Sequence, residues 1–288
     1  MLTLTVGPMF AGKSTALLRK YREAVLLGRR PLVVNHELDT RMGVSAVRSH
    51  LGDTIACVQT AALMPLLRLC RRPIAEAIPR VVTIVVPSGY RVTYSPKSRG
   101  GTVSVESWTT DPTRRRRGGG RRVWSFDERS PLDALDKAAL QLGMSGDELL
   151  RALVEEAAPA STRDAWADEG YCCVFIDEGQ FFADLSQFAI ECTRKSMCDV
   201  HIYSLDGDYK GRKFGQTLDL VPWANDITKL SGICGVCNNQ PGVLSKRLAT
   251  EENMGVLVGK DDYVQVLVGQ DEYVQSCRTC FFDTGREL

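Results

Sequence analysis

Short apolar and β-branched runs recur along the chain and end in polar or glycine-rich segments, a pattern typical of buried strands in a parallel sheet. Residues 2–6 and 32–36 are two such runs, and residues 15–28 between them are predicted to form a helix. Residues 174–176 and 200–205 are two more, separated by a predicted helix over 183–197. A helix-like segment over 218–224 and a strand over 227–230 follow. This alternation predicts an α/β fold with a parallel sheet.

Two adjacent carboxylates, Asp177 and Glu178, follow the apolar run at 174–176. Ligands of open α/β sheets bind at the carboxyl ends of the strands, so we expect both acids at a binding site. Successive side chains on a strand point to opposite faces. We therefore expect one acid to approach a Mg²⁺ ion and the other to reach a substrate hydroxyl. Taken alone, the pair also fits a solvated strand end.

The first predicted strand runs directly into a phosphate-binding loop of the pattern G-x-x-x-x-G-K-[ST]. Its residues are Gly7, Pro8, Met9, Phe10, Ala11, Gly12, Lys13 and Ser14. The glycines permit a backbone that turns successive N–H groups toward phosphates. Lys13 is predicted to reach the β and γ phosphate oxygens, and the Ser14 hydroxyl to bind Mg²⁺. Thr15 opens a helix whose positive end points at the same anion, so we expect ATP and Mg²⁺ here.

Residues 71–167 interrupt the α/β pattern. Runs at 81–86, 91–94 and 102–108 predict a small β-meander, and helices are expected from residue 130 and over 146–158. Between the meander and the helices, residues 114–122 contain six arginines and three glycines. This composition cannot bury apolar surface, so we expect a mobile tether rather than a contact with nucleic acid.

Cysteine spacing predicts a metal site toward the C-terminal end. Cys234 and Cys237 form one C-x-x-C pair, and Cys277 and Cys280 form another. Four thiolates in paired spacing suit a tetrahedral, structural Zn²⁺ ion. A redox role for one pair would leave the other pair unexplained.

The segment between the two cysteine pairs contains a tandem repeat. Residues 256–265 and 266–275 are near copies of each other, so Tyr263 and Tyr273 occupy equivalent positions. A zinc ion would clip both ends of this segment and lower its closure entropy.

Composition limits the class of protein. The chain has 288 residues, 44% of them hydrophobic, which allows one large domain or two with a sizeable core. A net charge of +1 gives no overall attraction to nucleic acid or to acidic membranes. No run approaches roughly eighteen uncharged apolar residues, and Met1 leads into a strand rather than a signal segment, so we expect a cytoplasmic protein. Ten cysteines in such a chain indicate metal ligands or buried thiols rather than disulfides.

These motifs, in their order, resemble those of the cytosolic-type thymidine kinases, the zinc-containing P-loop family. The resemblance rests on residues 7–14, the triplet Asp39-Thr40-Arg41, residues 177–182, 205–207 and 246–250, and both cysteine pairs. It covers about residues 1–70 and 168–285. It implies a RecA-like P-loop parallel sheet with helices on both faces plus a small C-terminal zinc-binding lasso domain, usually assembled as a homotetramer. The corresponding division is a kinase domain over 1–70 and 168–232, an insertion over 71–167 and a lasso domain over 233–288.

The resemblance also implies an activity and residue roles. The activity is transfer of the γ-phosphate of ATP to the 5′-hydroxyl of thymidine, with deoxyuridine as a second acceptor, in pyrimidine deoxynucleotide salvage. Glu178 would be the general base, with Arg41 nearby and Phe181 packed on the thymine ring. Arg41 could hold a phosphate, or it could be a solvated loop arginine. The motifs themselves predict Lys13 at the phosphates and Asp177 at Mg²⁺. Contacts to thymidine are expected from Met9, Phe181, Leu205 and Thr250, and from either Tyr263 or Tyr273.

Departures from the family pattern leave two other functions open. The insertion is foreign to the pattern, the lasso is lengthened by the repeat, and the chain stops soon after Cys280. A nucleic-acid-stimulated ATPase would carry the same phosphate loop and carboxylates, with Glu178 activating water instead of a sugar hydroxyl. A nucleotide- or zinc-dependent binding protein without catalysis is the third interpretation.

Overall fold

The computed structural model describes residues 1–39, 46–48, 52–70, 81–96, 101–107, 122–128, 131–157, 170–194, 198–248 and 273–283. The chain divides into two compact units. The first contains Met1–Leu18, Leu32–Arg72 and Tyr171–Leu288, and the second contains Arg19–Pro31 and Pro73–Gly170. The domain limits expected from the sequence, at 71–167 and 233–288, stay predictions.

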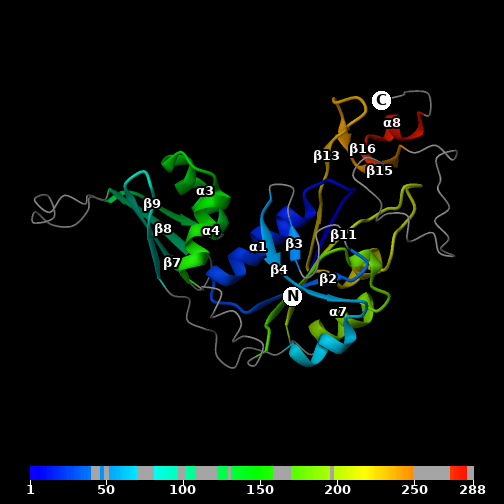
Figure 1. Cartoon of the computed structure of the whole chain (residues 1–288), viewed down its shortest axis with the longest axis horizontal. Coiled ribbons are helices and arrows are strands. Elements are labelled where there is room, and N and C mark those ends of the chain that lie inside the picture. Colours follow the sequence, from blue (N-terminus) through cyan, green and yellow to red (C-terminus); the bar gives the residue numbers. More distant parts are fainter. Residues whose placement is uncertain are drawn as a thin grey trace, which may run out of the picture. The chain divides into compact units, whose positions relative to one another are not determined.

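The first unit is built on a six-stranded sheet of order β12-β1-β11-β10-β2-β5. Two of its strands, β2 and β11, are labelled in Figure 1. Its strands are β1 (Leu2–Val6), β2 (Pro31–His36), β5 (Val58–Thr60), β10 (Cys173–Ile176), β11 (Asp199–Ser204) and β12 (Asp226–Lys229). β1 runs parallel to both β11 and β12, and β10 runs parallel to β11. The predicted α/β class with a parallel sheet is therefore confirmed.

Helices flank this sheet and complete its core. They are α1 (Lys13–Leu26), η1 (Met64–Leu69), η2 (Gly179–Phe181), α7 (Leu185–Arg194), η3 (Thr217–Trp223) and α8 (Arg278–Phe282). Every residue of β2 and β10 is buried, as expected where both faces of a parallel sheet are covered. Leu2, Leu4 and Val6 alternate along β1 and pack with Phe188 of α7 in one apolar core. The segment at 218–224, expected to be helix-like, is the 3₁₀ helix η3.

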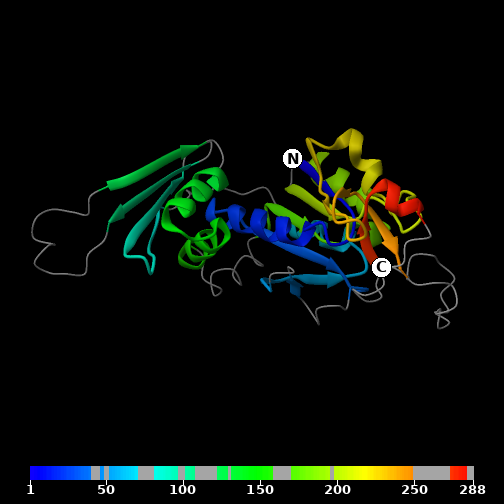
Figure 2. The same cartoon turned by 90° about the horizontal axis from the view of Figure 1, so that it is seen from above.

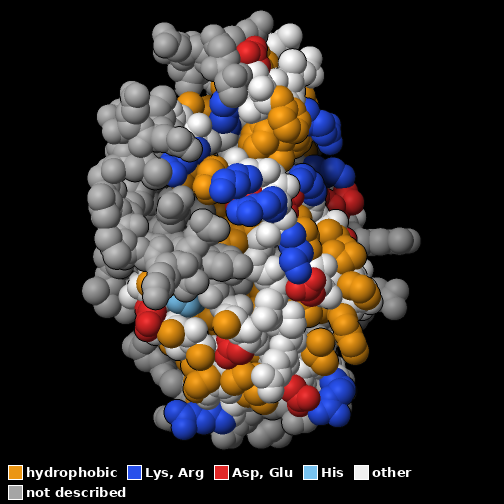
Figure 3. Space-filling model, turned by 90° about the vertical axis from the view of Figure 1, so that its right-hand side faces the viewer, with side chains coloured by type: hydrophobic (Ala, Val, Ile, Leu, Met, Phe, Trp, Pro, Cys, Tyr) orange, Lys and Arg blue, Asp and Glu red, His pale blue; other side chains and the backbone are white. Residues whose placement is uncertain are grey.

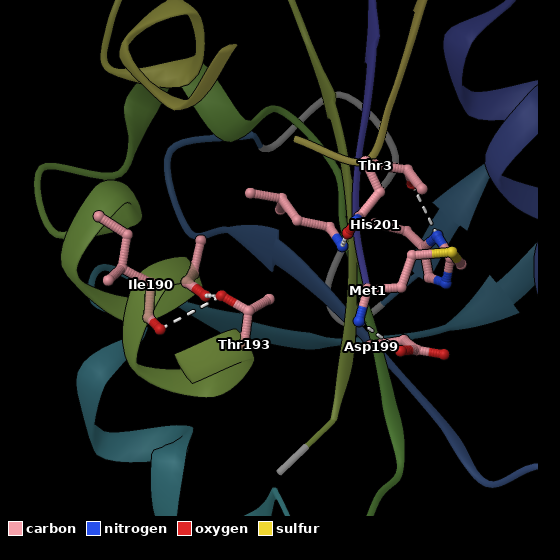
Figure 4. A network of polar contacts seen from close by, with 9 residues as sticks. Met1, Thr3, Ile190, Thr193, Asp199 and His201 are labelled. Atoms are coloured by element: carbon pink, nitrogen blue, oxygen red, sulfur yellow. Dashed lines mark hydrogen bonds and ion pairs between the residues drawn. The ribbon is translucent and has the colours of Figure 1, made fainter. Parts of the chain in front are cut away.

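Polar contacts fix β1 in register at its first residue (Figure 4). The amino group of Met1 lies 2.7 Å from the Asp199 carboxylate, and Thr3 Oγ1 lies 2.8 Å from His201 Nδ1. The backbone N–H of Leu2 donates to Asn225 Oδ1 at 2.7 Å. β1 leads directly into the phosphate loop, so these contacts also fix where that loop begins.

Three short antiparallel hairpins were not foreseen from the sequence. β3 (Ala46–Arg48) pairs with β4 (Thr54–Ala56), β13 (Gly232–Ile233) with β14 (Pro241–Gly242), and β15 (Leu244–Arg247) with β16 (Tyr273–Ser276). Each strand has at most four residues, too few for a period-2 pattern to stand out. The β15–β16 pair closes the segment that carries the tandem repeat.

The second unit holds a four-stranded antiparallel sheet and two helices (Figure 2). The strands are β6 (Val82–Val85), β7 (Tyr90–Pro96), β8 (Gly101–Ser107) and β9 (Arg122–Glu128), followed by α3 (Pro131–Leu142) and α4 (Gly146–Ala157). α3 packs on β8 and β9, and α4 packs on β6. The sequence predicted three of these strands and missed the fourth, β9. The arginine-rich composition of the preceding segment concealed where β9 begins. Arg122 belongs to β9, and residues 114–121 lie outside the described residues.

The second unit includes the C-terminal part of α1. Arg19 forms ion pairs with Asp136 of α3 and with Asp147 of α4. α1 is one continuous helix, so its sequence carries no sign that its two ends belong to different units.

The surface mixes both charge signs with apolar side chains. On the face in Figure 3, Lys and Arg side chains are interspersed with acidic ones, in keeping with the net charge of +1. Among the described residues, no helix is long and apolar enough to cross a membrane.

We expect Asp184→Ala to lower the free energy of unfolding by about 1–2 kcal/mol, the scale of a lost helix cap. Asp184 Oδ2 accepts the backbone N–H groups of Leu63 and Met64, both at 2.8 Å, at the start of η1. Urea denaturation measures the loss. Asp184→Asn keeps an acceptor oxygen and serves as the control, so equal destabilisation by both variants would contradict the capping role.

Candidate active site

The phosphate loop adopts the backbone that its glycines were expected to permit. Gly12 has φ +82°, and Phe10 has φ 63°, so the loop turns through left-handed conformations. Gly7 packs against the end of β12, where a Cβ atom would lie 2.6 Å from the carbonyl oxygen of Leu230. A side chain at position 7 would therefore push the loop away from the sheet.

A polar side chain of the loop meets Asp177, which directly follows β10. Ser14 Oγ donates to Asp177 Oδ2 at 3.0 Å, although the two residues are 163 positions apart. Lys13 is buried and its ammonium group donates to the carbonyl oxygen of Pro8 at 2.8 Å. The Ser14 hydroxyl and the Asp177 carboxylate are both hard oxygen ligands, and Mg²⁺ binds such ligands together with phosphate oxygens. Their short separation would let both contact one ion.

Glu178 does not lie on the strand, which corrects the expectation that it would alternate with Asp177. β10 ends at Ile176, and Glu178 has φ 51° and ψ 41° as it enters η2. The turn redirects its side chain by a backbone change rather than by the pleat of a strand. A left-handed conformation at a residue other than glycine costs energy and is concentrated at functional sites.

Buried hydrogen bonds hold the Glu178 carboxylate in place. Gln180 Nε2 donates to Glu178 Oε2 at 2.5 Å. Gln180 Oε1 in turn accepts the backbone N–H of Leu205 at 2.9 Å and lies 3.0 Å from Ser204 Oγ. Thr217 Oγ1 donates to Ser204 Oγ at 2.8 Å. A chain of buried polar groups thus connects Glu178 to the end of β11 and to η3.

A second carboxylate, that of Asp39, adds to the negative potential of Asp177 at this end of the sheet. Burial raises the pKa of the Cys57 thiol to about 11, and the charges of Asp177 and Asp39 raise it further in the same direction. Asp39 is buried and accepts a hydrogen bond from Asn35 Nδ2 at 3.0 Å. The local charge therefore favours a cation beside Asp177.

An apolar cluster, here named the Met9 cluster, lies beside these polar groups. It consists of buried Met9, Leu205, Phe214 and Tyr273, with Phe10, Phe181 and Tyr209 packed against it. The rings of Phe181 and Phe214 meet edge to face, with their centroids 5.7 Å apart. Four of the expected thymidine contacts, Met9, Phe181, Leu205 and Tyr273, are therefore neighbours in space. Arg41, Thr250 and Tyr263 lie outside the described residues.

The β15–β16 hairpin is fastened to the phosphate loop at a single residue. The backbone N–H of Met9 donates to Ser245 Oγ at 2.9 Å, and Gln275 Nε2 donates to the carbonyl oxygen of Met9 at 2.8 Å. Both side chains are buried. Ser245 is on β15 and Gln275 on β16, so one strand binds the N–H group of Met9 and its partner strand binds the carbonyl oxygen.

The four cysteines of the two C-x-x-C pairs converge. The sulfur atoms of Cys234, Cys237, Cys277 and Cys280 all lie within 4.8 Å of one another. Cys237 and Cys277 are 4.0 Å apart, close to the separation of about 3.8 Å that follows from a tetrahedron with 2.3 Å zinc–sulfur bonds. The donor set therefore fits a closed zinc site.

Backbone N–H groups favour ionised sulfur at one member of this cluster, Cys234. Burial opposes ionisation of the Cys234 thiol. Its pKa is nevertheless lowered to about 6, because backbone N–H groups of Cys237, Cys277 and Val236 point to its sulfur. Lys246 Nζ donates to the carbonyl oxygens of Cys280 and Asp283, both at 2.7 Å, and so ties β15 to the end of α8.

Several residues of the site were not identified from the sequence. Phe214 follows three basic residues, Lys210, Arg212 and Lys213. Arg212 pairs with Asp208, Lys213 pairs with Asp219, and Phe214 is buried in the Met9 cluster. An isolated apolar residue within a basic loop was the available signal. Ser245 and Gln275 carried no signal, because their contacts depend on long-range pairing.

Comparison with known proteins agrees with this geometry. The family model described as thymidine kinase matches residues 1–72 and 150–281. The chain belongs to the thymidine kinase family. Residues 73–149, which include the four-stranded sheet and α3, fall outside the matched ranges.

Individual members of the thymidine kinase family are similar over part of their length. Human cytosolic thymidine kinase is 36% identical over 129 residues, which are 44% of this chain and 50% of the relative. The thymidine kinase of Oryza sativa subsp. japonica is 24% identical over 260 residues, 90% of this chain and 61% of the relative. That of monkeypox virus is 31% identical over 114 residues, 40% of this chain and 58% of the relative. The matches thus span about half to three fifths of these relatives.

We expect Gln275→Glu to lower the free energy of unfolding by about 3 kcal/mol, because it buries a carboxylate against the carbonyl oxygen of Met9. Ser245→Ala removes one acceptor and should cost about 1–3 kcal/mol. Chemical denaturation measures both. The exposed Gln141→Glu on α3 is the matched control, and similar stability of Gln275→Glu and Gln141→Glu would contradict a fastening role for Gln275.

Proposed function

We propose that this protein is an ATP-dependent thymidine kinase that transfers the γ-phosphate of ATP to the 5′-hydroxyl of thymidine, giving dTMP for DNA synthesis. Deoxyuridine is proposed as a second acceptor. The observation that carries the proposal is one juxtaposition. Ser14 of the phosphate loop is hydrogen-bonded to Asp177, and Gln180 links Glu178 to Leu205. Leu205 packs with Met9 of the same loop in the apolar Met9 cluster, which suits a flat nucleobase.

Phosphoryl transfer requires positioning and charge neutralisation more than covalent chemistry by the protein. In the proposed mechanism, the 5′-hydroxyl oxygen of thymidine forms a bond to the γ-phosphorus while Glu178 takes the proton of that hydroxyl. The bond from that phosphorus to the β–γ bridging oxygen breaks, and ADP leaves. Lys13 and Arg41 neutralise the phosphate oxygens, and Phe181 packs on the thymine ring.

Binding of the base is assigned to the Met9 cluster. Met9, Leu205 and one tyrosine, Tyr273 or Tyr263, would line the space for the thymine methyl group, together with Thr250. Tyr273 is favoured, since it is buried with Met9 and Leu205. Met9 would thereby contribute its backbone to the phosphate loop and its side chain to base recognition.

Two metals belong to the proposal. Ser14 and Asp177 would hold Mg²⁺, which supplies charge stabilisation at the transferring phosphate when bound. Cys234, Cys237, Cys277 and Cys280 would hold a structural Zn²⁺ ion. The proposal further includes a homotetramer, which the resemblance implies. It also includes a cytoplasmic location, supported by the name of the human relative, cytosolic thymidine kinase.

A single assay tests the proposed function against the two alternatives. Purified protein is given ATP and Mg²⁺, and ADP release is followed with thymidine, deoxyuridine, single-stranded DNA or no addition. Release that depends on thymidine, with formation of dTMP, is the expected result. Release that depends on DNA would indicate an ATPase, and release in no condition would indicate a binding protein.

We expect Glu178→Gln to reduce phosphorylation by roughly 10²–10⁴-fold, the scale of a positioned general base, while ATP and thymidine still bind. Glutamine retains an oxygen that can accept the hydrogen bond from Gln180, so the turn should persist. Turnover and ligand affinity are measured side by side. Glu155→Gln, an exposed substitution on α4, is the matched control. Near-normal turnover in folded Glu178→Gln protein would refute the role.

We expect Cys277→Ser to lose the zinc ion and to weaken nucleotide binding indirectly. Serine is a good N-cap, so it can replace the Cys277 sulfur at the start of α8, and loss of the metal is the main change. Zinc content by metal analysis and ATP affinity are the measurements. Cys172→Ser, outside the four-cysteine cluster, should keep both. Zinc-free wild-type protein with full activity would contradict a structural zinc ion.

A further inference from the structure

A second group of cysteines lies in the core of the first unit, away from the two C-x-x-C pairs. Cys70 follows η1, Cys192 is on α7, and Cys198 immediately precedes β11. Their exposed fractions are 1%, 0% and 6%. The three sulfur atoms lie within 4.8 Å of one another, and those of Cys70 and Cys192 are 3.9 Å apart. We call this group the three-thiol cluster.

We propose that the three-thiol cluster is a binding site for one thiophilic d¹⁰ metal ion, with Cu(I) as the occupant. The first argument is distance. Three sulfur atoms around a trigonal ion with bonds of about 2.3 Å lie about 4.0 Å from one another. The Cys70–Cys192 separation of 3.9 Å is close to this value, and no sulfur–sulfur separation in the cluster exceeds 4.8 Å. Binding therefore requires only small shifts within a packed core.

The second argument is the donor set. No histidine or carboxylate joins the three sulfur atoms among the described residues. The nearest polar neighbours in sequence are already engaged. Asp199 pairs with the amino group of Met1, and Thr193 Oγ1 donates to the carbonyl oxygens of Ala189 and Ile190 (Figure 4). Sulfur alone selects soft ions. Closed zinc sites take four protein ligands, so three favour Cu(I).

The surroundings of the cluster are apolar. Cys70, Cys192 and Cys198 pack in one core with Leu63, Phe188 and Val200. A hydrophobic shell excludes water and with it the oxygen ligands that harder ions require. Buried cysteines otherwise serve as small hydrophobic residues, but that role does not require three sulfur atoms to converge.

The binding step involves no change of oxidation state. Each coordinating thiol loses its proton to solvent and forms a metal–sulfur bond. Apparent affinity should therefore rise with pH, since ionised sulfur is the ligand. The ion would join three separate elements, η1, α7 and the start of β11. Leu205 follows the opposite end of β11, so the ion would stabilise the sheet without entering the catalytic site.

The test is titration of zinc-containing protein with Cu(I), supplied anaerobically as its complex with a chromogenic chelator. Wild-type protein should remove one equivalent of Cu(I) from the chelator, retain its zinc, and gain several degrees in melting temperature. Cys192→Ala should lower the affinity at least tenfold and abolish the thermal shift. Cys173→Ala, which removes a buried cysteine from β10 outside the cluster, is the matched control and should behave as wild type.

Cys198→Ala, at the most exposed of the three positions, provides a second variant if Cys192→Ala folds poorly. Equal uptake of Cu(I) by wild type and the cluster variants would overturn the proposal, as would uptake matched by release of zinc. Measuring the zinc content of wild-type and Cys192→Ala protein tests whether the cluster binds zinc instead. A second zinc ion in wild-type protein, absent from Cys192→Ala, would overturn the assignment to Cu(I).

Discussion

The hydrogen bond between Ser14 and Asp177 is the contact on which the rest of the candidate site depends. It joins two loops that are 163 positions apart in the sequence. One loop follows β1 and the other follows β10, and the two loops can meet because only β11 lies between these strands in the sheet. The parallel register of β1 with β11 and of β11 with β10 sets the height of both loops. Glu178, Gln180 and Leu205 take their positions from the same three strands.

The sequence supports the prediction of this part of the fold because its signals are local. A few neighbouring residues suffice to recognise each of three motifs: the phosphate loop, the apolar run before Asp177 and the two C-x-x-C pairs. The turn at Glu178 could not be read in the same way. An apolar run followed by two acids does not reveal that the strand ends at Ile176 and that the next turn passes through a left-handed conformation.

Contacts made through pairing were the hardest to foresee. β16 has four residues, and its partner β15 lies before the tandem repeat, so neither strand has a distinctive pattern. The hydrogen bonds from Ser245 and Gln275 to the Met9 backbone depend on that pairing, and no local sequence pattern predicts them. The C-terminal part of α1 belongs to the second unit although the helix is unbroken, and no local signal in the sequence reveals that division.

The tandem repeat acquires an evolutionary meaning from the position of β16. Tyr273 and Gln275 close the second copy, and the first copy ends in the same Tyr263-Val264-Gln265. Removing either copy would leave Tyr-Val-Gln immediately before Ser276 and Cys277. The 25 residues from 248 to 272 would shorten to 15, a change in loop-closure entropy of only about 0.5 kcal/mol. A duplication at this point therefore costs the fold little free energy, because its junction reproduces the residues that pair with β15.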